Sequence, residues 1–182
     1  FLNQEDICLP RSVRKASLSL FLELGKMRLS TLVVATTLTG YILACRDSID
    51  GWRLLWTLAG TACAALGANS FNQWWEVRRD ARMERTRNRP LPAGRLTPSQ
   101  ALIWSAVISS TGVLLLASQV NGITALLALA NILLYVLVYT PLKPISSINT
   151  LAGAICGAIP PMMGWTAVTG QLGYGAWLLG AT

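Results

Sequence analysis

The sequence predicts an all-α protein, a multi-pass transmembrane helical bundle, and three observations support this fold class. Of the 182 residues, 53% are hydrophobic and only 13% are charged, whereas about 25% of the residues are charged in an average soluble domain. The apolar residues gather in segments close to the roughly 20 residues that a helix needs to cross a bilayer. The Lys and Arg residues behind the net charge of +7 lie mostly on one side of those segments, as the positive-inside rule requires.

The polar N-terminal segment, residues 1–28, comes first, and its apolar side chains between Ser12 and Gly25 are spaced as in an amphipathic helix. Such a helix is suited to the membrane surface. Residues 29–182 follow as one transmembrane domain. Its predicted spans are, in chain order, Leu29–Cys45, Leu54–Trp75, Ala101–Val120, Ile123–Tyr139 and Ile148–Val168, with the start of a sixth near Ala176. Because the chain begins at Phe1 and stops within an apolar run, we expect it to be a piece of a longer polypeptide.

The loops between the predicted spans assign their orientation. Residues 1–28, 76–100 and 140–147 contain five, seven and one Lys or Arg residues, whereas the opposite loops contain only Arg46 and Arg53. An excess of this size marks the inside face of the membrane. We therefore expect the Arg-rich loop after the second span and the short loop after the fourth span to lie at the same face.

The residue inventory excludes several classes of site. The chain has no histidine, which rules out a histidine-based catalytic triad or metal site within this stretch. The four cysteines are scattered, without the paired spacing of a zinc site or a disulfide framework. The basic residues lie between two spans and lack interleaved aromatic residues, so the chain is a poor fit for a nucleic-acid-binding protein.

Three polar side chains mark the end of the second span. Asn72, Glu76 and Asp80 are spaced at i, i+4 and i+8. On an α-helix, each step of four residues rotates the side-chain direction by about 40°, so the three side chains form one polar row roughly 12 Å long. Carboxylate and amide oxygens suit Mg²⁺, which binds one or two carboxylates together with phosphate oxygens. The alternative is that the two carboxylates pair with neighbouring residues such as Arg79 and Arg82 at a solvated helix end.

The loop after this helix is rich in arginine. Seven arginines lie between Arg78 and Arg95, and Pro90, Pro92 and Gly94 indicate a shaped loop instead of a continued helix. Guanidinium groups bind phosphate oxygens in a bidentate manner, so a cluster near acidic metal ligands fits a magnesium diphosphate. The alternative interpretation is a basic patch that orients the protein or binds lipid headgroups.

Two further features follow the fourth span. Tyr139 and Lys143 would be neighbours on one helix face, where they suit a phosphate, although Pro141 makes a regular helix doubtful. An aromatic anchor with a snorkelling lysine at the membrane interface is the alternative. In the fifth span, Gly153 and Gly157 form a face of small residues for close helix packing, and Pro160–Pro161 is expected to bend or break the helix.

These segments together resemble the UbiA family of intramembrane prenyltransferases. The run Asn72-Gln-Trp-Trp-Glu76-Val-Arg-Arg-Asp80 is similar to the first Asp-rich motif of that family, with Glu76 where most members have Asp. Its continuation, Met83-Glu-Arg85-Thr86-Arg-Asn-Arg89-Pro90-Leu91, resembles the branch that farnesylates haem, as does the later Tyr139-Thr-Pro-Leu-Lys143-Pro. The resemblance covers residues 24–182.

The resemblance implies a bundle of nine transmembrane helices, of which this chain holds five and the start of a sixth. It implies farnesyl diphosphate as the donor, haem B as the acceptor, haem O and diphosphate as the products, and Mg²⁺ as the cofactor. Asn72, Glu76 and Asp80 would be catalytic residues and metal ligands. The diphosphate contacts would be Arg85, Arg89, Lys143, Tyr139, Arg28 and Lys26.

The same resemblance implies a place in the cell. The mitochondrial type of this branch has Glu at the position of Glu76, which points to the mitochondrial inner membrane, with the basic loops on the matrix side, in preference to a bacterial inner membrane. The second metal motif of the family would lie beyond Thr182, so this stretch alone is expected to be inactive. Two other functions are considered: a prenyltransferase of the same family with a quinone or other aromatic acceptor, and a non-enzymatic multi-pass channel or transporter.

Overall fold

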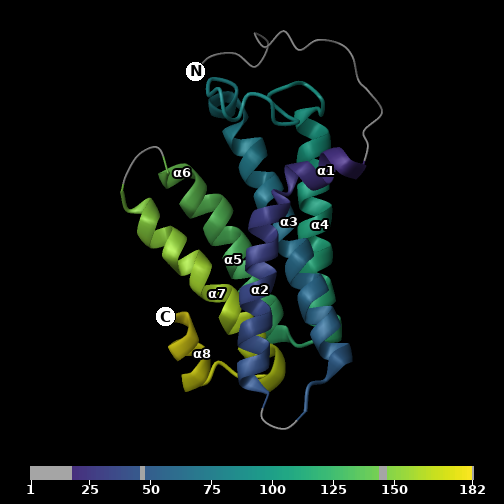
Figure 1. Cartoon of the computed structure of the whole chain (residues 1–182), viewed down its shortest axis with the longest axis vertical. Helices are drawn as coiled ribbons and strands as arrows, with labels where there is room; N and C mark the ends of the chain where they lie inside the picture. The colour runs from purple at the N-terminus through teal and green to yellow at the C-terminus, as the bar shows by residue number, and fades with distance from the viewer. Residues whose placement is uncertain (1–17, 46–47, 144–146, 182) are drawn as a thin grey trace.

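The computed structural model describes residues 18–45, 48–143 and 147–181, and the helices in these ranges form one bundle (Figure 1). Within these ranges there is no β-strand. The elements are α1 (Leu18–Leu24), α2 (Met27–Ala44), α3 (Gly51–Asp80), α4 (Pro98–Gln119), α5 (Gly122–Leu133), the π-helical η2 (Leu134–Tyr139), α6 (Thr140–Leu142), α7 (Asn149–Thr169) and α8 (Tyr174–Gly180). The all-α fold is therefore confirmed. Residues 12–17 of the predicted amphipathic helix lie outside the described residues, and the rest of it includes α1.

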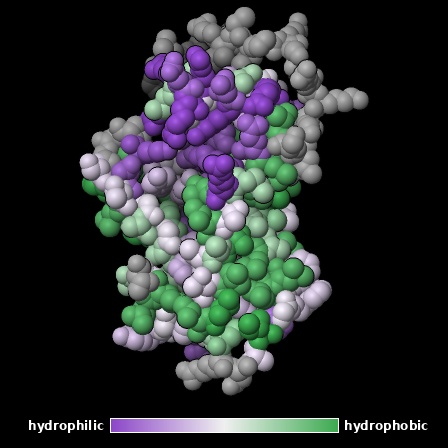
Figure 2. Space-filling model, in the orientation of Figure 1, coloured by the Kyte–Doolittle hydropathy of each residue, from purple (hydrophilic) through white to green (hydrophobic). Residues whose placement is uncertain are grey.

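Five stretches of the described chain are long and apolar enough to cross a membrane, and they match the five predicted spans. They are α2, α3, α4, the continuous stretch Gly122–Leu142 and α7. Figure 2 shows hydrophilic residues gathered over the end of the molecule that carries α1 and the loop between α3 and α4, with mostly apolar surface over the rest of this face. The helix α8 begins close to the predicted start of the sixth apolar run.

Local sequence explains where the long helices begin. The side chain of Asp50 accepts hydrogen bonds from the backbone N–H groups of Trp52 and Arg53 at the start of α3. Thr97 and Gln100 form a capping box at the start of α4, and Asn121 accepts from the Thr124 N–H at the start of α5. These side chains satisfy backbone donors that have no partner within the helix. The helix α3 then continues to Asp80, so the predicted polar row lies on one helix.

The prolines do not end their helices. The helix α7 continues through Pro160 and Pro161, so of the two predicted effects, a bend or a break, the break does not occur. Pro141 also lies inside a continuous stretch, because α6 directly follows η2. The N–H that Pro141 lacks falls where the hydrogen-bond pattern changes from π-helical to α-helical, so its loss disturbs little. As a result, Tyr139 and Lys143 share one helix, and the Lys143 N–H donates to the Tyr139 carbonyl oxygen at 3.1 Å.

The short helix α1 packs against protein. Leu24 is fully buried and clusters with Leu91, Leu96 and Ala101 from the loop after α3 and the start of α4. The ring of Phe21 lies 4.7 Å from that of Trp104 on α4, measured between centroids. The apolar side chains of α1 therefore fix the α3–α4 loop to the bundle.

The closest approach of α2 and α7 depends on glycine. A Cβ atom on Gly40 would lie 2.1 Å from the Pro161 carbonyl oxygen, and one on Gly164 would lie 2.0 Å from the Thr37 carbonyl oxygen. In contrast, a Cβ atom on Gly157 would meet nothing within 4 Å. Of the predicted pair, Gly153 does approach a neighbouring helix, because a Cβ atom there would lie 3.1 Å from the ring of Tyr139 on η2, whereas Gly157 makes no close contact.

This difference gives a test of the packing. In the full-length protein, Gly164→Ala should lower the free energy of unfolding by about 1–3 kcal/mol, because the added methyl group has no room. Gly157→Ala on the same helix is the matched control and should have almost no effect. Thermal unfolding in detergent measures both, and equal melting temperatures for the two variants would contradict the close α2–α7 contact.

Candidate active site

The polar row on α3 is buried at the end of the bundle. Asn72, Glu76 and Asp80 are only 0%, 6% and 3% exposed. The Asn72 side-chain amide donates to Glu76 Oε2 at 3.0 Å, which joins the first two members. A solvated helix end, the alternative considered from the sequence, does not describe these side chains. Buried carboxylates require hydrogen bonds or opposite charges to remain ionised.

Each carboxylate has a cationic partner from a different part of the chain. Lys143, directly after α6, donates from Nζ to Glu76 Oε1 at 3.1 Å. Arg89, in the loop after α3, donates from Nη1 to Asp80 Oδ2 at 2.5 Å. Neither partner is one of the arginines closest in the sequence. The site therefore contains two ion pairs that join α3 to α6 and to the α3–α4 loop.

Two threonines complete these connections. Thr140, 1% exposed on α6, donates from its hydroxyl to the Asn72 side-chain oxygen at 3.1 Å or to the Tyr135 carbonyl oxygen at 2.7 Å. Thr86, 2% exposed, donates to the Asp80 carbonyl oxygen at 2.9 Å. The hydrogen bond from Thr86 turns the loop back onto the end of α3, which brings Arg89 to the carboxylate of Asp80.

Lys26 is the third cation near the carboxylates. It lies between α1 and α2 in the left-handed backbone region, with φ of 50°, which is uncommon for a residue with a side chain. Hydrogen bonds hold the turn: Ser30 Oγ donates to the Gly25 carbonyl oxygen at 2.9 Å, and Gln73 Nε2 donates to the Leu24 carbonyl oxygen at 2.6 Å. Burial lowers the pKa of Lys26 to about 8; the charge of Arg89 adds to this effect and that of Glu76 opposes it.

The remaining predicted diphosphate contacts, Arg28, Arg85 and Tyr139, are less closely connected to the polar row. Arg28 and Arg85 are exposed, and among the described residues neither forms an ion pair with a carboxylate of the site. Tyr139 stacks on Tyr135, with ring centroids 5.2 Å apart. The structure therefore brings Lys26, Arg89 and Lys143 to the polar row, but not Arg28 and Arg85.

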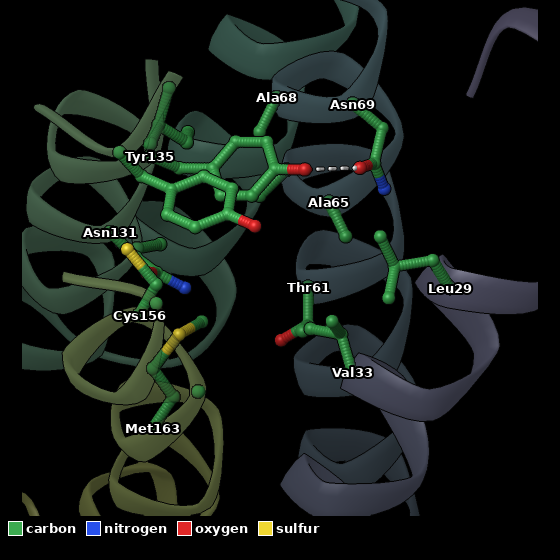
Figure 3. A pocket seen from close by; sticks show the side chains of 16 residues that line it. Leu29, Val33, Thr61, Ala65, Ala68, Asn69, Asn131, Tyr135, Cys156 and Met163 are labelled. Carbon is green, nitrogen blue, oxygen red and sulfur yellow. Dashed lines mark hydrogen bonds between the residues drawn. The ribbon is translucent and has the colours of Figure 1, made fainter. Parts of the chain in front are cut away.

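An apolar cavity of about 270 Å³ begins beside the polar row and extends into the bundle (Figure 3). Its wall is made mainly of small and aliphatic side chains from α2, α3, α5 and α7, together with the rings of Tyr135 and Tyr139. Asn69 stands at its upper part, where it donates to Ser30 Oγ at 3.1 Å and accepts from the Tyr135 hydroxyl at 3.2 Å. Asn69 is one turn from Asn72, so the cavity and the polar row are adjacent.

Sequence reasoning did not identify Asn69, Tyr135 or Gln73. A signal for two of them was present, because Asn69 lies three residues before Asn72 and Tyr135 lies four residues before Tyr139. Residues at these spacings share a helix face. Gln73 had no such signal, since its partner, the carbonyl of Leu24, is far away in the sequence.

The residues present fit a metal ion that is bound jointly with its substrate. The described residues contain no group of three or more His, Cys, Asp or Glu side chains that could hold an ion. The polar row offers two carboxylates and one amide oxygen. Mg²⁺ often uses only one or two carboxylates and completes its shell with phosphate oxygens and water. The donor set therefore fits Mg²⁺ bound together with a diphosphate.

Comparisons with known proteins agree with this geometry. Over about 86–87% of its length, the chain is 48% identical to the mitochondrial protoheme IX farnesyltransferases of Arabidopsis thaliana and Homo sapiens, of which it covers 37% and 35%. It is 43% identical to the protoheme IX farnesyltransferase of Thermosynechococcus vestitus, of which it covers 50%. The chain thus spans between about a third and a half of the length of these relatives.

A solved structure of a digeranylgeranylglyceryl phosphate synthase has the same fold, with a TM-score of 0.78 over 90% of this chain and 57% of the other, at 20% identity. The model of the UbiA prenyltransferase family matches residues 33–182. This range contains α3, with the polar row, and all of the cavity-lining residues except Leu29 on α2. The chain therefore belongs to the UbiA prenyltransferase family.

Proposed function

We propose that this chain is part of an enzyme that transfers the farnesyl group of farnesyl diphosphate to a vinyl group of haem B, releasing diphosphate and giving haem O. The observation that carries the proposal is the polar row of α3, where two buried carboxylates with cationic partners lie beside an apolar cavity. A prenyl diphosphate has the same two parts, a polyanionic head and an apolar tail. The names of the relatives support farnesyl as the group and haem as the acceptor.

The head of the donor would bind at the polar row. UbiA prenyltransferases generally use divalent metal ions to bind diphosphate substrates, and we assign Mg²⁺ to Asn72, Glu76 and Asp80. When bound, this ion would supply positive charge to the leaving diphosphate. Arg89, Lys143 and Lys26 would contact phosphate oxygens directly. Arg28, Arg85 and Tyr139 are assigned to the same diphosphate as outer contacts, because they lie at the same end of the bundle.

The residues of this chain would assist the departure of diphosphate. As the bond between C1 of the farnesyl group and the phosphate oxygen breaks, negative charge grows on the diphosphate. The guanidinium of Arg89 and the ammonium of Lys143 are already held at the site, so they would stabilise this charge with little reorganisation. The cavity beside Asn69 would hold the farnesyl chain away from water. The vinyl group then forms a bond to C1, and one water adds as hydroxyl, with loss of its proton.

Two other functions make different predictions. A relative with a quinone or other aromatic acceptor would prenylate such an acceptor but not haem B. A channel or transporter would catalyse neither reaction. Incubating the purified full-length protein with farnesyl diphosphate, Mg²⁺ and each acceptor separates the three. Formation of haem O supports the proposal, whereas prenylation of the quinone precursor alone, or no transfer, would overturn it.

We also propose the mitochondrial inner membrane as the location, with the basic end of the bundle at the matrix face. The two eukaryotic relatives support this assignment by name, and the excess of Lys and Arg at one end supports the orientation. Residues 29–182 would form a partial UbiA prenyltransferase transmembrane domain, and residues 1–28 a polar N-terminal segment.

Asp80 provides a direct test of the polar row. In the full-length enzyme, Asp80→Asn should lower kcat/KM for farnesyl transfer by about 100-fold or more, because it removes a charge that organises the bound diphosphate. Membrane insertion should remain intact. Glu84→Gln is the matched control, since Glu84 is an exposed carboxylate only four residues away. Haem O synthesis at the control level in the Asp80 variant would contradict the assignment.

Arg89 forms an ion pair with Asp80 in the site, whereas Arg87, two residues earlier, is exposed. The two arginines are therefore a matched pair for mutagenesis. Arg89→Gln should raise the KM for farnesyl diphosphate by about tenfold, as expected for loss of one charge-assisted phosphate contact. Arg87→Gln should leave KM unchanged, because Arg87 is exposed and forms no ion pair among the described residues. Steady-state kinetics in the full-length protein measure both. An equal rise in both variants would indicate a general effect of positive charge.

A further inference from the structure

The end of the cavity farthest from the polar row contains two side-chain oxygen atoms that no group of the described residues satisfies. Thr61 lines the cavity from α3 and is only 1% exposed, and its hydroxyl has no hydrogen-bond partner among the described residues. Asn131 lines the opposite wall from α5, and its buried side-chain oxygen also lacks a partner there. Figure 3 shows both side chains pointing into the space between the two walls.

The course of the helices shows that these two residues are far from the polar row. The helix α3 runs toward the row, and Thr61 is the first of its residues to line the cavity. The stretch from α5 to α6 runs the same way, and Asn131 precedes Lys143 by twelve residues. The helix α7 runs in the opposite direction, so Met163 lies at the same end of the cavity.

Thr61 differs from its nearest equivalent on the same helix. Thr57, one turn earlier, donates its hydroxyl to the Arg53 carbonyl oxygen at 2.7 Å, which is the usual way for a helical threonine to satisfy itself. Thr57 does not line the cavity. The hydroxyl of Thr61 is directed into the cavity and gives up that bond. Between Thr61 and Asn69 the α3 wall is made of Ala64, Ala65 and Ala68, which offer only methyl groups.

We propose that Thr61 and Asn131 set the length of the isoprenoid chain that the cavity accepts, by giving an apolar chamber a polar end. This inference rests on the proposed function, since it concerns the tail of the same donor. Water can hydrogen-bond the two polar groups as long as the chain ends short of them. A longer chain covers them without offering a hydrogen bond, which is unfavourable.

The dimensions agree with a farnesyl donor. Thr61 precedes Asn72 by eleven residues, which is about 16 Å along the axis of α3. This distance is comparable to an extended chain of three isoprene units. A fourth unit, as in geranylgeranyl diphosphate, would reach the polar pair.

The test is a competition between two donors in the full-length protein. Wild type and the double variant Thr61→Val with Asn131→Leu receive equal concentrations of farnesyl and geranylgeranyl diphosphate, and the ratio of the two prenylated haem products is measured. The double variant should raise the geranylgeranyl-to-farnesyl ratio by about tenfold, equivalent to about 1.4 kcal/mol. Both replacements keep the side-chain shape and remove the polar atoms, so any change reports polarity.

Matched variants control for packing and for the fold. Thr57→Val makes the same chemical change one turn away, outside the cavity, and should leave the product ratio unchanged. Thr61→Ser keeps the hydroxyl and should behave like wild type. An unchanged ratio in the double variant overturns the inference, and so does a change in the KM for haem alone, which would mean that the pair contacts the acceptor.

The outcomes also separate this inference from the proposed function. If wild type prenylates no haem, the proposed function fails, and the chain-length inference is then decided by binding: the ratio of the Kd values of the two diphosphates must shift in the double variant. If wild type forms haem O, and the double variant shifts neither the product ratio nor the ratio of the two Kd values, only the chain-length inference fails.

Discussion

The burial of two carboxylates at the end of α3 is the constraint on which the rest of the site depends. A buried carboxylate requires hydrogen bonds or an opposite charge, and loss of one partner from a buried ion pair typically costs about 3–5 kcal/mol. Glu76 draws Lys143 to α3, and Asp80 draws Arg89. Consequently, the end of the fourth span and the α3–α4 loop are held against the same helix turns, and the fold gathers cations where a polyanion would bind.

These ion pairs also explain how one site can serve both before and after a diphosphate binds. Arg89 and Lys143 neutralise the carboxylates in this structure. A metal ion that bound the carboxylates would take over that role, and the two cations could turn to the phosphate oxygens with little movement. Lys26 adds to this balance, because burial and the charge of Arg89 lower the pKa of Lys26. An arriving anion would oppose that effect and favour the charged amine.

Local patterns predicted much of this arrangement, and long-range contacts account for what they missed. Apolar segment length and the distribution of basic residues predicted the five spans, and helical spacing predicted the polar row. The choice of Arg89 over the nearer Arg79 and Arg82 depends on how the loop folds back through Thr86. The pairing of Lys143 depends on the contact between α6 and α3 through Thr140 and Asn72. The close α2–α7 contact at Gly40 and Gly164 likewise depends on two helices far apart in the sequence. None of these contacts can be read from spacing along one helix.

The position of the site at the end of the bundle suits the amphiphilic donor that we propose. Hydrocarbon cannot solvate a diphosphate, and water cannot accommodate an isoprenoid chain without cost. One molecule can satisfy both requirements only where a charged surface adjoins an apolar chamber. Asn69 is the residue at that junction: it lines the chamber and, through Ser30, is linked to the turn that carries Lys26. In the proposed complex, binding of the tail and placement of the charge that meets the head would thus be connected through a single side chain.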